Sequence, residues 1–236
     1  MIADKSWNML PDKGKAIMLA QREVASFVCD AVNLEGIPFT LPEIQTLLDG
    51  ITVGGHRLEE QQIAVNQGNA WKHLFASLQS GSFILSAEYA CKLHAIAAKE
   101  EALTWGAFRN GGVTIAGTSW EPPSYDTLPS RFADMVAAAG RMDDIYGRAI
   151  FVFLEMARNQ FFYDVNKRLG RLMMNGILLD AGYPAINLPA RRQLEFNQLM
   201  LEFYPSGDPA PMNRFMRSCL DERIIGIMQE TRQTKK

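Results

Sequence analysis

The sequence predicts a mainly α-helical fold, on the strength of three observations. Apolar residues recur at helical spacing along most of the 236 residues. Helix-boundary signals flank these stretches, such as the capping-box pattern Thr-Leu-Pro-Glu at residues 40–43 and the stop at Gly36 and Pro38. Residues 104–124 break the pattern with six glycines or prolines around a short β-like run. We therefore expect a helical bundle with one small β-hairpin in this segment.

The expected helices can be placed in chain order. The first covers about residues 11–34, where apolar positions follow a period close to 3.6. A short helix begins after Thr40 and runs to about Asp49. The remaining helices are expected at residues 58–79, 86–101, 128–139, 143–158, 167–181, 189–203 and 209–229. The last residues, TRQTKK, are expected to fray.

Length and composition fit one soluble domain, or one domain with a small appendage. We divide it into an N-terminal helical region (residues 1–80), a core (81–204) and a C-terminal helix with a tail (205–236). No apolar run would span a bilayer, and the N-terminus lacks the apolar core of a signal peptide, so we expect a cytoplasmic protein without a membrane partner. A net charge of −2 argues against a nucleic-acid partner. The oligomeric state stays open, with a homodimer among the options.

The stretch Asn159–Asn175, NQFFYDVNKRLGRLMMN, carries the main signal for chemistry. A short polar loop opens a helix with Lys167, Arg168 and Arg171 in its first turns. A helix N-terminus offers unpaired N–H groups and a positive dipole end, so these cations favour a bound anion such as phosphate. Asp164 beside phosphates is a typical Mg²⁺ ligand. The alternative is a capped helix with an exposed basic first turn.

This stretch resembles the Fic family signature HxFx(D/E)GN(G/K)RxxR. Six of its eight specified positions match in register: Phe162, Asp164, Asn166, Lys167, Arg168 and Arg171. CKLHAIA and GAFRNGGVTIAGTSWEPP are similar to the family's helix and β-hairpin flap. LEGIPFTLPEIQTLLDG is similar to the N-terminal region of Fic proteins with a built-in inhibitory helix, here about residues 11–36. The resemblance to the Fic/DOC (Fido) family covers roughly residues 25–200 and implies a Fic-type bundle with a flap.

The resemblance implies a transferase that moves AMP from ATP to a hydroxyl of an unidentified target protein. It implies Mg²⁺ on Asp164 and docking of the target at flap positions Val113, Thr114 and Ile115. Its implied catalytic positions are Gln160 (in the histidine position), Asp164, Asn166, Arg168 and Arg171. Its implied nucleotide-binding positions are Val165, Asn166, Lys167, Arg168, Gly170 and Arg171. Some members move other phosphate-containing groups, so the transferred group stays open.

Two positions depart from the signature. Gln160 replaces a histidine that would take the proton of the attacking hydroxyl, and a glutamine amide has no usable basicity. Losing a general base typically costs about 10²–10⁴ in rate. Val165 replaces a glycine, so either the loop follows another path or its anion hole is distorted. His94 could substitute as base if it lies nearby, although a packed histidine is the simpler interpretation.

Residues 31–36, AVNLEG, resemble the family's inhibitory pattern (S/T)xxxE(G/N). A Glu35 carboxylate paired with Arg171 would occupy the place of the terminal phosphate, because an Arg–carboxylate pair is strong and directional. Ala31 replaces the Ser/Thr of the pattern and loses a hydroxyl that would tether the glutamate. The alternative is a solvated glutamate near a helix C-terminus.

Three functions remain open from the sequence. The first is a Fic-type protein adenylyltransferase, autoinhibited by Glu35 and with compromised or altered catalysis. The second is an inactive nucleotide-binding regulator, favoured by Gln160 and Val165. The third is a helical DNA-binding regulator, which rests only on helix-turn-helix-like spacing around residues 40–80, where basic residues are few. We favour the first.

Overall fold

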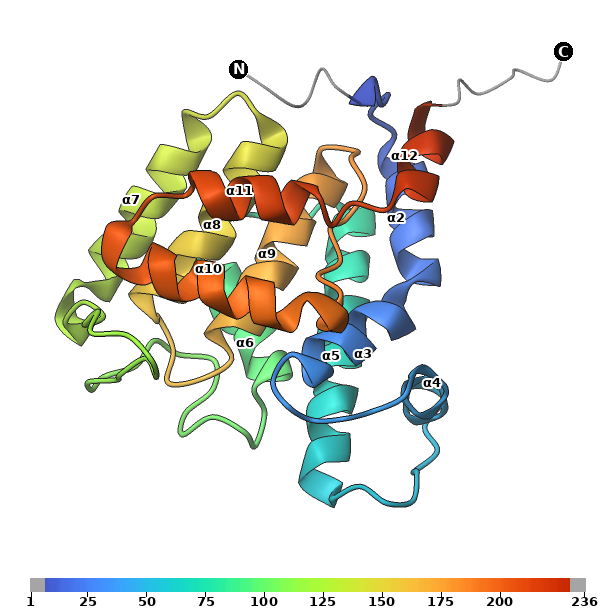
Figure 1. The fold of residues 1–236 in the computed structure, drawn as a ribbon, viewed down its shortest axis with the longest axis horizontal. Coiled ribbons are helices and arrows are strands. Elements are labelled where there is room, and N and C mark those ends of the chain that lie inside the picture. The colour runs from blue at the N-terminus through green and yellow to red at the C-terminus, as the bar shows by residue number, and fades with distance from the viewer. Residues whose placement is uncertain (1–6, 230–236) are drawn as a thin grey trace, which may run out of the picture.

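The computed structural model describes residues 7–229 and is built from helices packed around a central pair (Figure 1). The described residues form eleven α-helices and two 3₁₀ helices, which confirms the mainly α prediction. The elements in order are α2 (Lys13–Arg22), α3 (Val24–Asn33), α4 (Leu41–Leu48), α5 (Leu58–Ser80), α6 (Ala87–Ala97), η1 (Tyr125–Thr127), α7 (Leu128–Gly140), α8 (Ile145–Asn159), α9 (Asn166–Asp180), η2 (Ala190–Arg192), α10 (Gln193–Ser206), α11 (Ala210–Arg217) and α12 (Glu222–Gln229). The tail expected to fray, TRQTKK, lies outside the described residues.

The central pair is α8 and α9, which pack on each other more extensively than any other two elements. Nearly every residue of α9 is buried, because neighbouring helices surround it on all sides. In Figure 1, α10 and α11 cross one face of this pair, while α2, α3 and α5 lie along another. The connection between α8 and α9 lies at one end of this packed pair, and it belongs to the stretch Asn159–Asn175 that carries the signal for chemistry.

Two stretches expected as single helices are each broken in two. Residues 11–34 divide at Glu23, which leaves helical geometry with φ −98° and ψ 2°. The break lets α2 pack on α9 while α3 turns onto α4 and α5. Residues 209–229 also divide, into α11 and α12, with the longer break of residues 218–221 between them. Periodicity cannot reveal such breaks, because the apolar spacing continues through the bend.

The β-hairpin expected in residues 104–124 is absent, and this prediction is wrong. Within residues 7–229 the structure has no strand, and the segment is a loop. The carbonyls of Gly111 and Pro123 accept hydrogen bonds from the Arg109 side chain instead of pairing with a second strand. The Arg158 guanidinium carbon lies 3.8 Å from the centre of the Trp120 ring, and the Trp120 indole N–H donates to the Arg158 carbonyl. Side-chain contacts thus replace the backbone ladder.

None of the helices in the described part of the chain combines the length and apolar character that a membrane crossing requires.

Candidate functional site

The loop between α8 and α9 turns at two non-glycine residues with left-handed backbone. Gln160 ends α8 with φ 49° and ψ 61°, and Val165 precedes α9 with φ 63° and ψ 9°. A β-branched residue in this region is disfavoured by about 1–2 kcal/mol. The Val165 side chain is buried, so its packing offsets part of this cost. Val165 therefore adopts a left-handed backbone that glycine tolerates best, at the position where the signature has glycine.

The side-chain amides of Gln160 and Asn166 hold this loop closed. Asn166 accepts from the Phe162 N–H (2.9 Å) and donates to the Phe162 carbonyl (2.7 Å). It also donates to Gln160 Oε1 at 3.0 Å, while Gln160 Nε2 donates to the Ala157 carbonyl at 2.6 Å. Both polar ends of Gln160 are engaged. This amide supports the loop, and it lacks the basicity to take a proton from a substrate.

His94 does not supply the missing base. Its ring is fully buried and stacks on Phe162, with centroids 3.9 Å apart. Nδ1 accepts from the Gly106 N–H at 3.1 Å, so Nε2 carries the proton and donates to the Asp164 carbonyl at 3.2 Å. Burial lowers the pKa of His94 to about 4, which keeps the ring neutral. The geometry agrees with the packed interpretation, and both ring nitrogens are engaged.

Arg168 faces a carboxylate that the sequence did not suggest. Its side chain is 4% exposed, and its two terminal nitrogens pair with the two oxygens of Glu101 (Nη1–Oε2 2.9 Å). Burial acts to lower the pKa of Arg168, but the Glu101 carboxylate raises it by more. Glu101 lies 67 residues upstream, in the turn after α6, and no sequence pattern links it to Arg168. The expected phosphate contact of Arg168 would have to compete with this pair.

Glu35 lies beside the other two cations of α9. Its carboxylate is 3.3 Å from Lys167 Nζ and 3.7 Å from Arg171 Nη2. Burial acts to raise the pKa of Glu35, but Lys167 and then Arg171 lower it by more, so the carboxylate is charged. The expected proximity of Glu35 and Arg171 is present in the structure.

The Arg171 guanidinium is buried without hydrogen bonds. The residue is 8% exposed, and none of its three side-chain nitrogens has a hydrogen-bond partner. Burial lowers the pKa of Arg171 to about 10. A buried donor without an acceptor is costly, so the Arg171 side chain needs a hydrogen-bonding anion or water in addition to the Glu35 carboxylate, which lies 3.7 Å away. Gly170, expected among the nucleotide-binding residues, is packed instead against Phe153 and Met156 of α8.

Asp164 is exposed at the same end of α9, and one of its oxygens accepts from the Val165 N–H at 2.6 Å. No group of three or more His, Cys, Asp or Glu residues within 7–229 could hold a metal by itself. The unsatisfied Arg171 and the uncapped start of α9 suit phosphates instead. Asp164 therefore fits Mg²⁺ only where phosphate oxygens and water complete the coordination.

A cavity of about 380 Å³ opens between the 104–124 loop, the α8–α9 loop and α10. It is lined by Thr114, Ile115, Ala116, Gln160, Lys167, Asn197, Met200, Leu201 and Tyr204. Two of the three expected flap positions thus border it, and Val113 does not. A larger cavity of about 470 Å³ lies between α2, α3 and the α11–α12 region. It contains none of the residues singled out for chemistry, so the smaller cavity is the better candidate.

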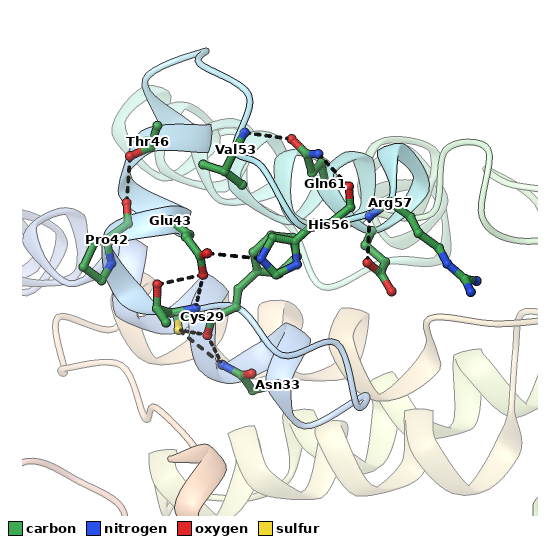
Figure 2. A network of polar contacts seen from close by, with 12 residues as sticks. Cys29, Asn33, Pro42, Glu43, Thr46, Val53, His56, Arg57 and Gln61 are labelled. Atoms are coloured by element: carbon green, nitrogen blue, oxygen red, sulfur yellow. Dashed lines mark hydrogen bonds and ion pairs between the residues drawn. The ribbon is translucent and has the colours of Figure 1, made fainter.

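The segment that follows Glu35 is held at both ends, as Figure 2 shows. Asn33 donates to the Phe39 carbonyl at 2.9 Å, and His56 stacks on the Phe39 ring with centroids 3.9 Å apart. His56 also lies 3.2 Å from the Glu43 carboxylate, which caps α4 through the Thr40 N–H as the capping-box pattern predicted. These contacts fix residues 34–40 between α3 and α4, and with them the position of Glu35.

The comparisons with known proteins all match this chain to Fic proteins. Residues 84–178 match the Fic/DOC family profile. "Protein adenylyltransferase Fic" of Drosophila willistoni is 23% identical over 219 residues, covering 90% of this chain and 43% of that protein, and the Drosophila mojavensis protein is 22% identical with the same coverage. The chain therefore spans less than half the length of these relatives.

Two solved structures share the fold. C. elegans Fic-1 (residues 134–508) superposes with a TM-score of 0.77 at 20% identity, covering 95% of this chain and 67% of that one. A Fic domain containing signaling protein from Bacteroides thetaiotaomicron gives 0.76 at 18% identity, covering 95% of this chain and 93% of that one. At these identities the likeness establishes the all-helical fold and not the activity.

The neutral, buried state of His94 predicts a pH dependence of stability. Its pKa falls from an ordinary 6.5 to about 4 in the fold, so its stabilising contribution is present above pH 6.5 and is lost as the pH falls towards 4. Urea unfolding between pH 7 and 4 should show the wild type losing up to about 3 kcal/mol more than His94→Gln. Equal pH slopes in the two proteins would contradict a neutral buried His94.

The Arg168–Glu101 pair predicts a large cost for removing one partner. Glu101→Gln leaves a buried guanidinium uncompensated and should lower the free energy of unfolding by about 3–5 kcal/mol. The matched control is Glu88→Gln, which removes an exposed partner of Lys92 and should leave the free energy of unfolding nearly unchanged, because solvent screens an exposed ion pair. Chemical denaturation measures the free energy of unfolding of both variants. An equally small loss in the two would show that the Glu101–Arg168 pair does not stabilise the fold.

Proposed function

We propose, from the match of residues 84–178 to the Fic/DOC family, that this protein binds a nucleoside triphosphate at residues 160–171 and is built as a protein adenylyltransferase with weakened catalysis. One observation carries the proposal above the others. Arg171 is a buried guanidinium with no hydrogen bond, at the start of a helix that also lacks a cap. An anion with several oxygens would satisfy both.

Phosphates would lie at the N-terminus of α9. This helix has no side-chain cap hydrogen bond and no acidic residue in its first turn, so its N–H groups and dipole are available to an anion. Lys167 is partly exposed there and borders the 380 Å³ cavity. The apolar walls from Ile115 and Met200 would receive the nucleoside. Mg²⁺, held by Asp164 with phosphate oxygens and water, would neutralise phosphate charge.

Transfer of AMP requires a hydroxyl oxygen of the target to bond to the α-phosphorus while the bond to pyrophosphate breaks. The hydroxyl proton must leave in the same step. Gln160 cannot accept it, because a glutamine amide has no usable basicity near neutral pH. The proton would pass to solvent, which predicts a rate about 10²–10⁴ below that with a general base. Positioning and charge stabilisation by α9 would remain.

Glu35 would act as a competitor of the phosphates. Its charged carboxylate occupies the space beside Lys167 and Arg171, and a phosphate would have to displace it. The contact with Arg171, at 3.7 Å and without a hydrogen bond, makes this a loose clamp. Ala31 and Arg171 both line a cavity of about 20 Å³, which is large enough for one water. A hydroxyl side chain at position 31, in place of Ala31, would lie next to this cavity and could help to hold Glu35.

A second candidate function is nucleotide binding without transfer, in a regulator. The closed hydrogen bonding between Gln160 and Asn166 favours it, because the amide stabilises the loop while excluding proton transfer. The two candidates share the nucleotide site and differ only in turnover.

The clamp predicts tighter nucleotide binding when Glu35 is neutralised. Glu35→Gln removes a charge that competes with phosphate and should lower the Kd of MgATP by about tenfold or more, measured by calorimetry. Glu23→Gln is the matched control, because its carboxylate pairs with the exposed Arg223 away from α9. No binding by any of the three proteins would refute the nucleotide site, and an unchanged Kd would refute the clamp.

Restoring the base predicts gain of transfer. Gln160→His combined with Glu35→Gly, incubated with α-labelled ATP, should label itself or an added partner about 10²-fold faster than the wild type. Arg171→Ala in that background should abolish labelling. Labelling from γ-labelled ATP alone would identify phosphate as the transferred group. MgATP binding without labelling in any variant would establish the regulator instead.

A further inference from the structure

Arg109 joins two parts of the candidate site that lie about 50 residues apart in the sequence. Its side chain is buried, at 3% exposed. Nε donates to the Gln160 carbonyl at 2.6 Å and Nη1 to the Gly111 carbonyl at 2.7 Å. Nη2 donates to the carbonyls of Pro123 and Asn159. All four acceptors are backbone oxygens, so this guanidinium works as a connector between chain segments.

The four acceptors belong to two structural units. Asn159 and Gln160 end α8, where the last carbonyls lack helical partners and the dipole favours a cation. Gly111 and Pro123 lie on the two arms of the 104–124 loop. The Arg109 N–H adds a bond to the Phe161 carbonyl at 2.9 Å. One residue therefore closes the loop and ties it to the first residue of the signature segment.

These contacts set the width of the 380 Å³ cavity. Residues 114–116, which form one wall, lie between Gly111 and Pro123 in the chain. Gln160, on the opposite wall, has its carbonyl held by Arg109 in a left-handed conformation that few residues adopt. A lysine could not reproduce this, because it presents one nitrogen where the planar fork reaches separate acceptors.

We propose that Arg109 is a positioning residue: it holds residues 111–123 over the signature loop, so that a target segment bound there presents its hydroxyl beside Gln160. The side chain itself touches neither nucleotide nor target. The inference rests on the proposed function for what the cavity receives, whereas the link between loop and Gln160 stands on the contacts alone. Nucleotide binding at α9 does not use Arg109. Replacing Arg109 should therefore impair transfer to the target and leave nucleotide binding intact.

The test compares Arg109→Lys and Arg109→Gln with Arg148→Lys. Arg148 is a matched control, because its side chain also donates twice to a backbone carbonyl, that of Met142, and does not line the cavity. Hydrogen exchange of amides 110–123 should accelerate about tenfold or more in both Arg109 variants and not in the control. The Kd of MgATP should stay within about twofold of wild type in all three.

The functional readout uses the Gln160→His/Glu35→Gly background. Adding Arg109→Lys should lower self-labelling at saturating α-labelled ATP by about tenfold or more and leave the KM for ATP unchanged. A parallel rise in the KM for ATP, unchanged exchange of residues 110–123, or global unfolding of both Arg109 variants would overturn the positioning role. If that background shows no labelling, the adenylyltransferase proposal fails, and exchange together with MgATP affinity still decides the role of Arg109.

Discussion

Compensation of three cations at the start of α9 is the constraint on which the candidate site depends. Lys167, Arg168 and Arg171 gather at a helix end whose dipole already repels positive charge. Two of them are buried, and an uncompensated buried charge is not tolerated. The chain supplies Glu101 to Arg168 and Glu35 to the other two. The turns that follow α6 and α3 therefore both meet the start of α9 through a carboxylate.

The two carboxylates differ in how completely they satisfy their partners. Glu101 binds both terminal nitrogens of Arg168 and forms a fixed link between α6 and α9. Glu35 stands at ion-pair distance from Arg171 and leaves its donors without hydrogen bonds. A site that must admit a phosphate needs one cation free to exchange partners and another that keeps the helix in place. The difference between the two pairs matches that division.

The departures at Gln160 and Val165 affect separate properties of the loop. Val165 has a left-handed backbone at the start of α9, a conformation that glycine adopts most easily. Gln160 keeps the loop closed through Asn166 but has no basicity. In the proposed function, these two departures bear on separate tasks: the path of the loop at the start of α9 on the seating of phosphates, and the side chain of Gln160 on proton removal. Arg109 in addition links the 104–124 loop to the Gln160 carbonyl.

The sequence by itself determined the helical class and the cationic start of α9, because periodicity and helix-end chemistry are properties of neighbouring residues. It did not reveal Glu101, nor the break at Glu23, and it predicted a hairpin where Arg109 organises a loop. Those features depend on contacts between segments tens of residues apart, which no local pattern records. The proximity of Glu35 to Arg171 was expected from the family resemblance, whereas only the tertiary structure decided that Glu101 faces Arg168, because burial makes each charge depend on its neighbours in space.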